Sequence, residues 1–188
     1  MENTLYIKNM VCPRCVAAVD NFLKSNNFNV LSVELGKAVI DKEINPVDKD
    51  IIAKGLKDLG FELLDGKKSR TVEQIKNCVI EFVHYQEGNL NQNLSDYIVS
   101  KLHSDYSSLS KMFSEQESTT IEKYFIAQKI EKVKELLSYG EMTLNEIAFK
   151  LNYSSPAYLS AQFKQVTGMT PSQYKASKSK DRKFLDSI

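Results

Sequence analysis

The chain has 188 residues, 42% of them hydrophobic and 26% charged, and a formal net charge of +1. These values are ordinary for a folded globular protein with one large or two small domains, and they argue against disorder. No stretch approaches the roughly 20 apolar residues of a membrane span, and the N-terminal MENTLYIKNM lacks the pattern of a secretion signal. We therefore expect a cytoplasmic protein with no membrane partner.

The charges are divided unevenly along the chain. Residues 1–66 hold 8 basic and 10 acidic side chains, a net charge of −2, whereas residues 67–188 hold 17 and 14, a net charge of +3. This mild bias permits nucleic-acid binding by the second half but does not indicate it. Three cysteines, two of them in a CxxC, do not form a disulfide framework and favour metal or thiol chemistry.

The first 66 residues predict an alternation of strands and helices, with Gly36 turning a hairpin and Gly60 ending the second helix. Strands are expected at Leu5–Lys8, Asn29–Leu35, Ala38–Ile40 and Phe61–Leu64, and helices at Pro13–Ser25 and about Val47–Leu59. Leu31, Val33 and Leu35 are expected on one face of their strand, and Ile52, Leu56 and Leu59 are expected to be buried on the second helix. The order βαββαβ predicts an α+β, ferredoxin-like sandwich.

The junction of the first strand and the first helix carries the sequence Met10-Val11-Cys12-Pro13-Arg14-Cys15. Cys12 is expected in the loop and Cys15 in the first helical turn, so both sulfurs can converge on one ion. The free amides and the dipole of that turn are expected to favour the thiolate form. Two soft thiolates suit Cu(I) best, whereas Zn(II) would need further ligands, and none is evident nearby.

This MxCxxC motif resembles that of heavy-metal-associated domains, the fold of copper chaperones and of soluble modules of copper-pumping ATPases, over residues 1 to about 65. The resemblance implies that Cys12 and Cys15 bind Cu(I) or another soft or borderline metal such as Ag or Zn. It also implies that Met10 packs inward as a spacer, since core packing suits it better than ligation. Phe61 is expected to lie near the site and to exclude water.

The motif departs from the family pattern and has rival interpretations. Asn9 and Val11 stand where Gly and Thr are usual, and Pro13 is uncommon within the CxxC, although it suits the first position of a helix. Thioredoxin-like oxidoreductases also use CPxC, but in a larger fold with a different strand order. A vestigial pair without a ligand is disfavoured because the cysteines stand where the fold would place a metal site.

The segment Asp65–Ser69 is polar and is expected to link two domains, with residues 67–70 as the linker. Thr71 and Gln74 are expected to cap a helix that runs to about Glu87, followed by a loop over residues 88–93. The inward positions of that helix are predicted at Ile75, Val79, Phe82 and Val83. Cys78 is interpreted as a buried apolar residue, and the two histidines, His84 and His103, have no ligand spacing.

The stretch from Thr143 to Tyr174 predicts a helix-turn-helix unit. A capping box at Thr143 opens a helix to about Leu151, a turn follows over residues 152–155, and Pro156 begins a second helix that Gly168 and Pro171 end. A shift of 50 residues reveals an upstream copy with helices near Leu94–Leu102 and Tyr106–Glu115. Matched positions include Ser104 with Ser154, Leu109 with Leu159, and Phe113 with Phe163.

The run formed by Phe163, Gly168, Thr170-Pro171 and Tyr174 resembles the end of the AraC-family DNA-binding domain, which carries two such units. The resemblance implies an all-α domain over residues 71–176, with units at about 94–115 and 143–166 and a spacer helix over 119–139 capped by Thr119 and Glu122. Residues 177–188 form a tail, expected to be a solvated end. The two recognition helices would enter major-groove segments of double-stranded DNA roughly 34 Å apart.

The resemblance to the AraC-family domain, applied by position along the recognition helices, implies the candidate DNA contacts. Base-facing residues are expected at Ser107, Ser110 and Lys111 in the first unit and at Ala157, Tyr158 and Ala161 in the second, with Lys164 and Gln165 on phosphates. No arginine stands in either recognition helix, so the bidentate arginine contact to guanine is missing. A·T-rich sites read partly by shape are therefore expected.

These features predict a metal-responsive DNA-binding transcriptional regulator, in which a metal-binding module replaces the larger sensory domain typical of the AraC family. Metal shared by the CxxC loops of two monomers would produce a homodimer; alternatively, the loaded loop would shift the conformation of the DNA-binding domain. One rival is a metal-trafficking protein without sequence-specific DNA binding, and another is a thiol oxidoreductase. No catalytic constellation is apparent, so no enzymatic activity is expected.

Overall fold

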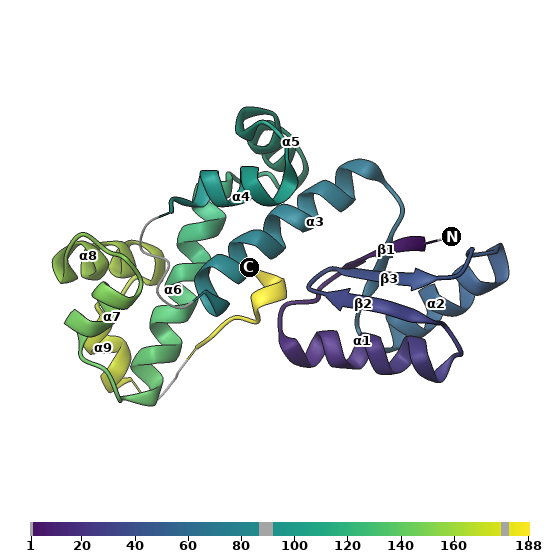
Figure 1. Cartoon of the computed structure of the whole chain (residues 1–188). Coiled ribbons are helices and arrows are strands. Elements are labelled where there is room, and N and C mark those ends of the chain that lie inside the picture. The colour runs from purple at the N-terminus through teal and green to yellow at the C-terminus, as the bar shows by residue number, and fades with distance from the viewer. Residues whose placement is uncertain (1, 87–91, 178–180) are drawn as a thin grey trace. The chain divides into compact units, whose positions relative to one another are not determined.

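A computed structural model describes residues 2–86, 92–177 and 181–188 of the chain. The chain divides into two compact units, Met1–Asn77 and Cys78–Ile188 (Figure 1). The predicted end of a helix at Glu87, most of the predicted loop over 88–93, and residues 178–180 of the tail lie outside the described residues. Within the described ranges, no helix combines the length and the apolar character needed to cross a bilayer.

The first unit has the predicted order of strands and helices. Its elements are β1 (Glu2–Lys8), α1 (Pro13–Ser25), β2 (Val30–Glu34), β3 (Lys37–Asp41), α2 (Pro46–Asp58) and β4 (Glu62–Leu64). The strands form one antiparallel sheet in the order β2-β3-β1-β4. Alternate residues of β1, Leu5 and Ile7, are buried together with Val19 and Leu23 of α1, so the core lies between the sheet and its helices.

Two predictions for this unit are wrong, the shared face of Leu31 with Val33 and the burial of Leu59. Leu31 is 48% exposed because a bulge between Val30 and Ser32 breaks the alternation of β2, and Val30 and Val33 pack against the core instead. Leu59 is 46% exposed because α2 ends at Asp58, which places Leu59 at the helix cap rather than on the buried stripe.

The predicted linker over residues 67–70 is also wrong, because these residues begin helix α3 (Lys67–Ile80), which continues as a π-helix over Glu81–Tyr85. Thr71 does not cap a helix; its hydroxyl donates a hydrogen bond to the carbonyl oxygen of Lys67. No proline interrupts this stretch, and Lys and Arg are good helix formers, so the helix begins at Lys67 rather than at Thr71. The boundary between the two units therefore falls inside α3, after Asn77.

The second unit consists of helices. They are α4 (Leu94–Leu102), α5 (Tyr106–Glu117), α6 (Ile121–Tyr139), α7 (Leu144–Lys150), α8 (Pro156–Thr167), α9 (Pro171–Ala176) and a short 3₁₀ helix (Leu185–Ser187). The spacer helix α6 packs against α5, α7, α8 and α9 (Figure 1). The predicted helices are confirmed, but the cap of α6 is Thr120 rather than Thr119, and α9 was not predicted.

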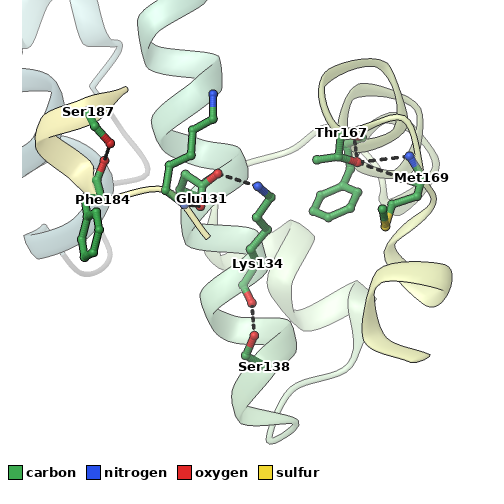
Figure 2. A network of polar contacts seen from close by, with 9 residues as sticks. Glu131, Lys134, Ser138, Thr167, Met169, Phe184 and Ser187 are labelled. Carbon is green, nitrogen blue, oxygen red and sulfur yellow. Dashed lines mark hydrogen bonds and ion pairs between the residues drawn. The ribbon is translucent and has the colours of Figure 1, made fainter. Parts of the chain in front are cut away.

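The described end of the tail, residues 181–188, is attached to α6 rather than solvated throughout. Arg182 donates to Glu135 at 2.8 Å, and the amide of Lys183 donates to Glu131 at 3.1 Å. Glu131 also accepts from Lys134 at 2.6 Å, as Figure 2 shows. These contacts use carboxylates on one face of α6, so the prediction of a wholly solvated tail is wrong for this segment.

Candidate nucleic-acid interface and thiol pair

The two helix-turn-helix units use the same buried aromatic pair. In the first unit the rings of Phe113 and Tyr124 are 5.7 Å apart, and in the second those of Phe163 and Tyr174 are 5.6 Å apart. All four side chains are buried. Because Tyr124 and Tyr174 are also separated by 50 residues, the repeat extends beyond each recognition helix into the element that follows it.

The helix ends of the two units match as well. The side chains of Asp105 and Ser155 each accept a hydrogen bond from the amide three residues later, so they cap α5 and α8. Both recognition helices end in a left-handed residue, Ser118 with φ 54° and Gly168 with φ 80°. The local signals that begin and end each recognition helix are therefore repeated along with the core.

Five of the six exposed residues of α8 form what we call the α8 face, Ala157, Tyr158, Ala161, Lys164 and Gln165; the sixth is Val166. These five positions recur at helical spacing and are all exposed, while Leu159 and Phe163 anchor the opposite side in the core. The face carries one positive charge and no carboxylate. The structure therefore places every predicted DNA-contacting residue of the second unit on one accessible surface.

The corresponding positions of α5, found by the 50-residue shift, form the α5 face: Ser107, Ser108, Lys111, Ser114 and Glu115. Ser107 and Lys111 are exposed as predicted, but Ser110 is half-buried beside the core side of the helix. Ser108, which sequence reasoning missed, is exposed and matches Tyr158 in the second unit. Applying the repeat residue by residue would have identified it.

The start of α5 is negatively charged, unlike the start of α8. Asp105 accepts hydrogen bonds from the Ser107 hydroxyl at 2.6 Å and from the Ser108 amide at 3.0 Å, and these bonds lower the pKa of its carboxyl. The cap of α8 is the neutral Ser155. A phosphate would meet repulsion from the ionised Asp105, so α8 is better suited than α5 to accept DNA phosphates at its N-terminus.

In the first unit, Cys12 and Cys15 lie where the sequence predicts them. Cys12 is the N-cap residue of α1, and the amide of Cys15 donates to its carbonyl oxygen at 2.9 Å. The two sulfur atoms are 3.1 Å apart, and both side chains are half-buried. This turn geometry brings the thiols together at the start of the helix.

The expectation that the helix terminus favours the thiolate is not met at Cys15. Burial raises the pKa of the Cys15 thiol, and its hydrogen bond with Cys12 raises it further. Backbone hydrogen bonds at Val11 and Cys12 act in the opposite direction but are smaller influences. At Cys15, desolvation therefore outweighs the helix terminus, and a ligand would have to displace the proton of this thiol.

Met10 and Phe61, the two residues expected beside the thiol pair, both pack in or against the core of the first unit. Met10 is completely buried in the core, so its sulfur points away from solvent. Phe61 is half-buried against that core and lines a hollow of about 460 Å³ together with Asn9 and Gly60. Among the described residues, no group of three or more His, Cys, Asp or Glu side chains could hold a metal ion.

Asn9 stands where the resembling family usually has glycine, and it adopts φ 71°, a left-handed conformation that asparagine tolerates. Its amide donates to Glu73 Oε1 at 3.0 Å, and its side-chain nitrogen donates to the carbonyl oxygen of Gly60 at 3.3 Å. Glu73 lies on α3 and is 7% exposed. Asn9 therefore joins the thiol loop to the loop before β4 and to α3, all within the first unit.

Comparisons with known proteins concern the second unit. A family model described as "Helix-turn-helix domain" matches residues 98–177. The xylose operon regulatory protein of Escherichia coli K12 is 29% identical over 99 residues, which are 52% of this chain and 25% of that protein. YtdP of Bacillus subtilis, an uncharacterized HTH-type transcriptional regulator, is 26% identical over 117 residues, 62% of this chain and 15% of its own.

Among solved structures, the C-terminal domain of AraT, a response regulator from Geobacillus stearothermophilus, covers 62% of this chain and 95% of its own, with 22% identity and a TM-score of 0.49. This chain spans about a quarter or less of the two curated relatives it matches. The family match begins within α4 and ends after α9, and it includes both recognition helices. The second unit of this protein therefore contains a helix-turn-helix domain over residues 98–177.

Proposed function

We propose that this protein is a cytoplasmic transcriptional regulator whose DNA binding responds to a soft metal ion, Cu(I), held by Cys12 and Cys15. The observation that carries the proposal is the 3.1 Å separation of the two sulfurs in a chain that also contains a helix-turn-helix domain, which resembles that of the AraC family. The βαββαβ order and the strand order β2-β3-β1-β4 support a ferredoxin-like fold, the fold that the MxCxxC resemblance implies.

The donor set fits Cu(I) better than Zn(II). Two metal–sulfur bonds of about 2.3 Å each can bridge sulfurs up to about 4.6 Å apart, so a small opening of the pair accommodates one ion. Two thiolates satisfy a soft monovalent ion, whereas Zn(II) would take two more ligands from solvent or from a second chain. Four thiolates from two chains would couple metal binding to dimerisation.

The contacts of Asn9 favour the alternative in which the loaded loop acts within one chain. A metal ion on Cys12 and Cys15 changes the backbone of the loop that begins at Asn9, and the amide of Asn9 is bonded to Glu73 of α3. Residues of α3 beyond Asn77 belong to the second unit. A loop state that binds metal a hundredfold better than the other state shifts their balance by about 2.7 kcal/mol, which is enough to regulate DNA binding.

The DNA-binding part of the proposal rests on the α8 face. Lys164 and Gln165 would contact phosphates, and Ala157 or Ala161 would contact thymine methyl groups. In α5, Lys111 would contact a base. With no arginine in either recognition helix, A·T-rich sites recognised partly through groove shape remain the expected targets.

One anaerobic experiment tests the whole proposal. Genomic DNA fragments bound by the protein are selected with and without Cu(I), using the wild type and the double variant Cys12→Ser/Cys15→Ser. We expect metal to change the selected set or the yield for the wild type only. The variant Cys78→Ala, which removes the remaining thiol, is the matched control and should behave as the wild type. Identical selections in every arm would refute metal regulation and leave DNA binding intact.

The route through Asn9 has its own variants. Glu73→Met removes the acceptor at similar size, whereas Glu73→Gln keeps an oxygen that can accept from Asn9. We expect the methionine variant to bind Cu(I) and DNA separately but to lose the effect of one on the other, and the glutamine variant to retain it. Equal coupling in both variants would assign regulation to another route, such as the metal-bridged dimer.

A second candidate function, metal trafficking without sequence-specific DNA binding, is favoured by the acidic start of α5 and by the arginine-free recognition helices. A salt titration separates the two candidates. Each phosphate contact contributes a slope of about −0.9 in the logarithm of affinity against the logarithm of salt concentration. A regulator with several contacts shows a steep slope, and a trafficking protein shows no such binding.

A further inference from the structure

Lys129 is a partly buried lysine of α6 that faces aromatic rings. Its Nζ lies 3.7 Å from the ring centroid of Tyr153 and 5.4 Å from that of Phe125. Burial alone lowers the pKa of Lys129 to about 8, and none of the described charged side chains contributes to that change. An ammonium group held in such surroundings costs desolvation free energy, so its presence calls for a compensating role.

Tyr153, the residue whose ring lies closest to this ammonium, has no counterpart in the first helix-turn-helix unit. His103 and Asn152, both left-handed, mark equivalent points of the two turns. One residue, Ser104, separates His103 from the cap of α5, whereas two residues separate Asn152 from the cap of α8. The second turn is therefore one residue longer, and the extra residue is Tyr153.

The position of Lys129 is also special to the second unit. Before the extra residue the two units are offset by 49 residues, which places Ile80 at the position of Lys129, and Ile80 is 2% exposed. The first unit thus has an aliphatic side chain where the second has a cation over an aromatic ring. The lysine and the inserted tyrosine occur together, which indicates that they act as a pair.

Tyr153 connects Lys129 to the recognition helix α8. Its hydroxyl donates a hydrogen bond to Gln162 Oε1 at 2.9 Å, and its ring lies 6.1 Å from the ring of Tyr158, centroid to centroid. Tyr153 is buried, whereas Tyr158 is 54% exposed on the α8 face. A change at Lys129 therefore reaches an exposed residue of the α8 face through one buried ring.

We propose that Lys129 is a positioning residue that fixes Tyr153, and through it Tyr158 and the α8 face, in the DNA-binding orientation. The inference rests on DNA binding by α8, which belongs to the proposed function, and it adds a proton-dependent control of that binding. Protonated Lys129 holds the ring by a cation–π interaction; neutral Lys129 releases it. Tyr153 itself stays neutral in this range, because burial raises its pKa far above the usual value.

The test measures DNA affinity of the full chain between pH 7 and pH 9, on a fragment selected with the wild type, for the wild type and Lys129→Arg. Arginine keeps its charge and its stacking over a ring throughout this range. We expect the affinity of the wild type to fall about tenfold relative to Lys129→Arg as the pH rises, the size of a desolvated cation–π interaction. Lys129→Met should bind about tenfold more weakly at pH 7, with a flat profile. Lys123→Met, on the exposed side of α6, should match the wild type.

A second readout does not depend on DNA. The ring resonances of Tyr158, followed by NMR, should titrate with a midpoint near pH 8 in the wild type and not in Lys129→Arg. Parallel pH profiles of affinity and identical Tyr158 titrations in these two proteins would overturn the inference while leaving DNA binding by α8 intact. Absence of any salt-sensitive DNA binding by the wild type would overturn the proposed function and this inference with it.

Discussion

The two helix-turn-helix units have the same interior and different exteriors. Both bury a phenylalanine against a tyrosine at nearly equal distances, and both cap the recognition helix with an oxygen-bearing side chain. On their exposed faces, no position that is charged in one unit is charged in the other. The α5 face carries Lys111 and Glu115 and follows the acidic cap Asp105, whereas the α8 face carries Lys164 and follows the neutral cap Ser155. Packing thus fixes the repeated scaffold, while the solvent-facing positions are free to take different roles in recognition.

The largest expected effect tests the shared interior. Phe113→Ala and Phe163→Ala each remove a fully buried ring, and each should lower the free energy of unfolding by about 3 to 5 kcal/mol. Denaturant titrations of the two variants measure this. Similar losses would support equivalent packing, whereas a loss of under about 1 kcal/mol in one unit would show that its core relaxes and is not equivalent.

The next effect is a pH dependence of the free energy of unfolding that His84 gives to the first helix-turn-helix unit and that has no counterpart in the second. His84 donates to Gln128 Oε1 at 3.0 Å, and burial lowers the pKa of His84 to about 4. The 49-residue offset that holds before the inserted Tyr153 places the fully buried Val133, which cannot titrate, at the corresponding position.

The folded state holds His84 neutral, whereas the unfolded state takes up a proton below about pH 6.5. The contribution of His84 to the free energy of unfolding should therefore be constant above pH 6.5. It should fall by about 2 to 3 kcal/mol as the pH drops toward 4.

The measurement for His84 is denaturant unfolding at several pH values. Lys132, Glu135 and Arg182 are the charged neighbours that also affect the pKa of His84, so a variant isolates the contribution of the histidine. His84→Gln should remove most of the acid-dependent loss. The exposed His103, changed to Gln, should leave the profile as it is. Equal profiles for the two variants would contradict the assignment.

A third pair of substitutions compares the two faces on DNA. Lys111→Ala should weaken binding to a selected site by about 1 to 3 kcal/mol and relax its specificity, because Lys111 is assigned to a base. Lys164→Ala should weaken specific and random DNA alike and reduce the salt slope by about 1, because Lys164 is assigned to a phosphate. Equal losses on both kinds of DNA for Lys111→Ala would remove its assignment to base recognition.

The smallest expected effect concerns the ends of the recognition helices. Ser118 and Gly168 share the left-handed conformation, but only serine has a Cβ. Ser118→Gly should stabilise the fold by up to about 1 kcal/mol, and Gly168→Ala should destabilise it by about 1 kcal/mol. A Cβ at Gly168 would meet no heavy atom within 4 Å, so the cost there comes from φ alone. Thermal unfolding measures both, and a neutral Gly168→Ala would contradict this account.

Much of the fold follows from local sequence signals, and the errors have physical causes. Capping residues and apolar spacing located α1, α7 and α8 to within about one residue. The exposure of Leu31 could not be predicted, because a bulge depends on how β2 pairs with β3. Helix α9 was predictable: Thr170 and Gln173 form a capping box, and Pro171 is at the first helical position, where proline begins a helix rather than ending one.

The candidate site was only partly predictable. The CxxC spacing placed Cys12 and Cys15 correctly at the start of α1, and helical spacing placed the α8 face. The contact of Asn9 with Glu73 joins residues 64 positions apart, which no local pattern reveals. The pairing of Lys129 with Tyr153 likewise required coordinates, because it depends on how the turn between α7 and α8 packs on α6.

The attachment of residues 181–188 to α6 affects how the DNA-binding domain should be cut for separate study. The family match ends at residue 177, yet Gln128 is fully buried and its side-chain nitrogen donates to the carbonyl oxygen of Leu185 at 3.1 Å. A fragment trimmed at the match would also strip Glu131 and Glu135 of their partners Lys183 and Arg182. Recombinant fragments that keep the sequence through Ile188 should accordingly express in better yield and resist proteases longer than those that stop at 177.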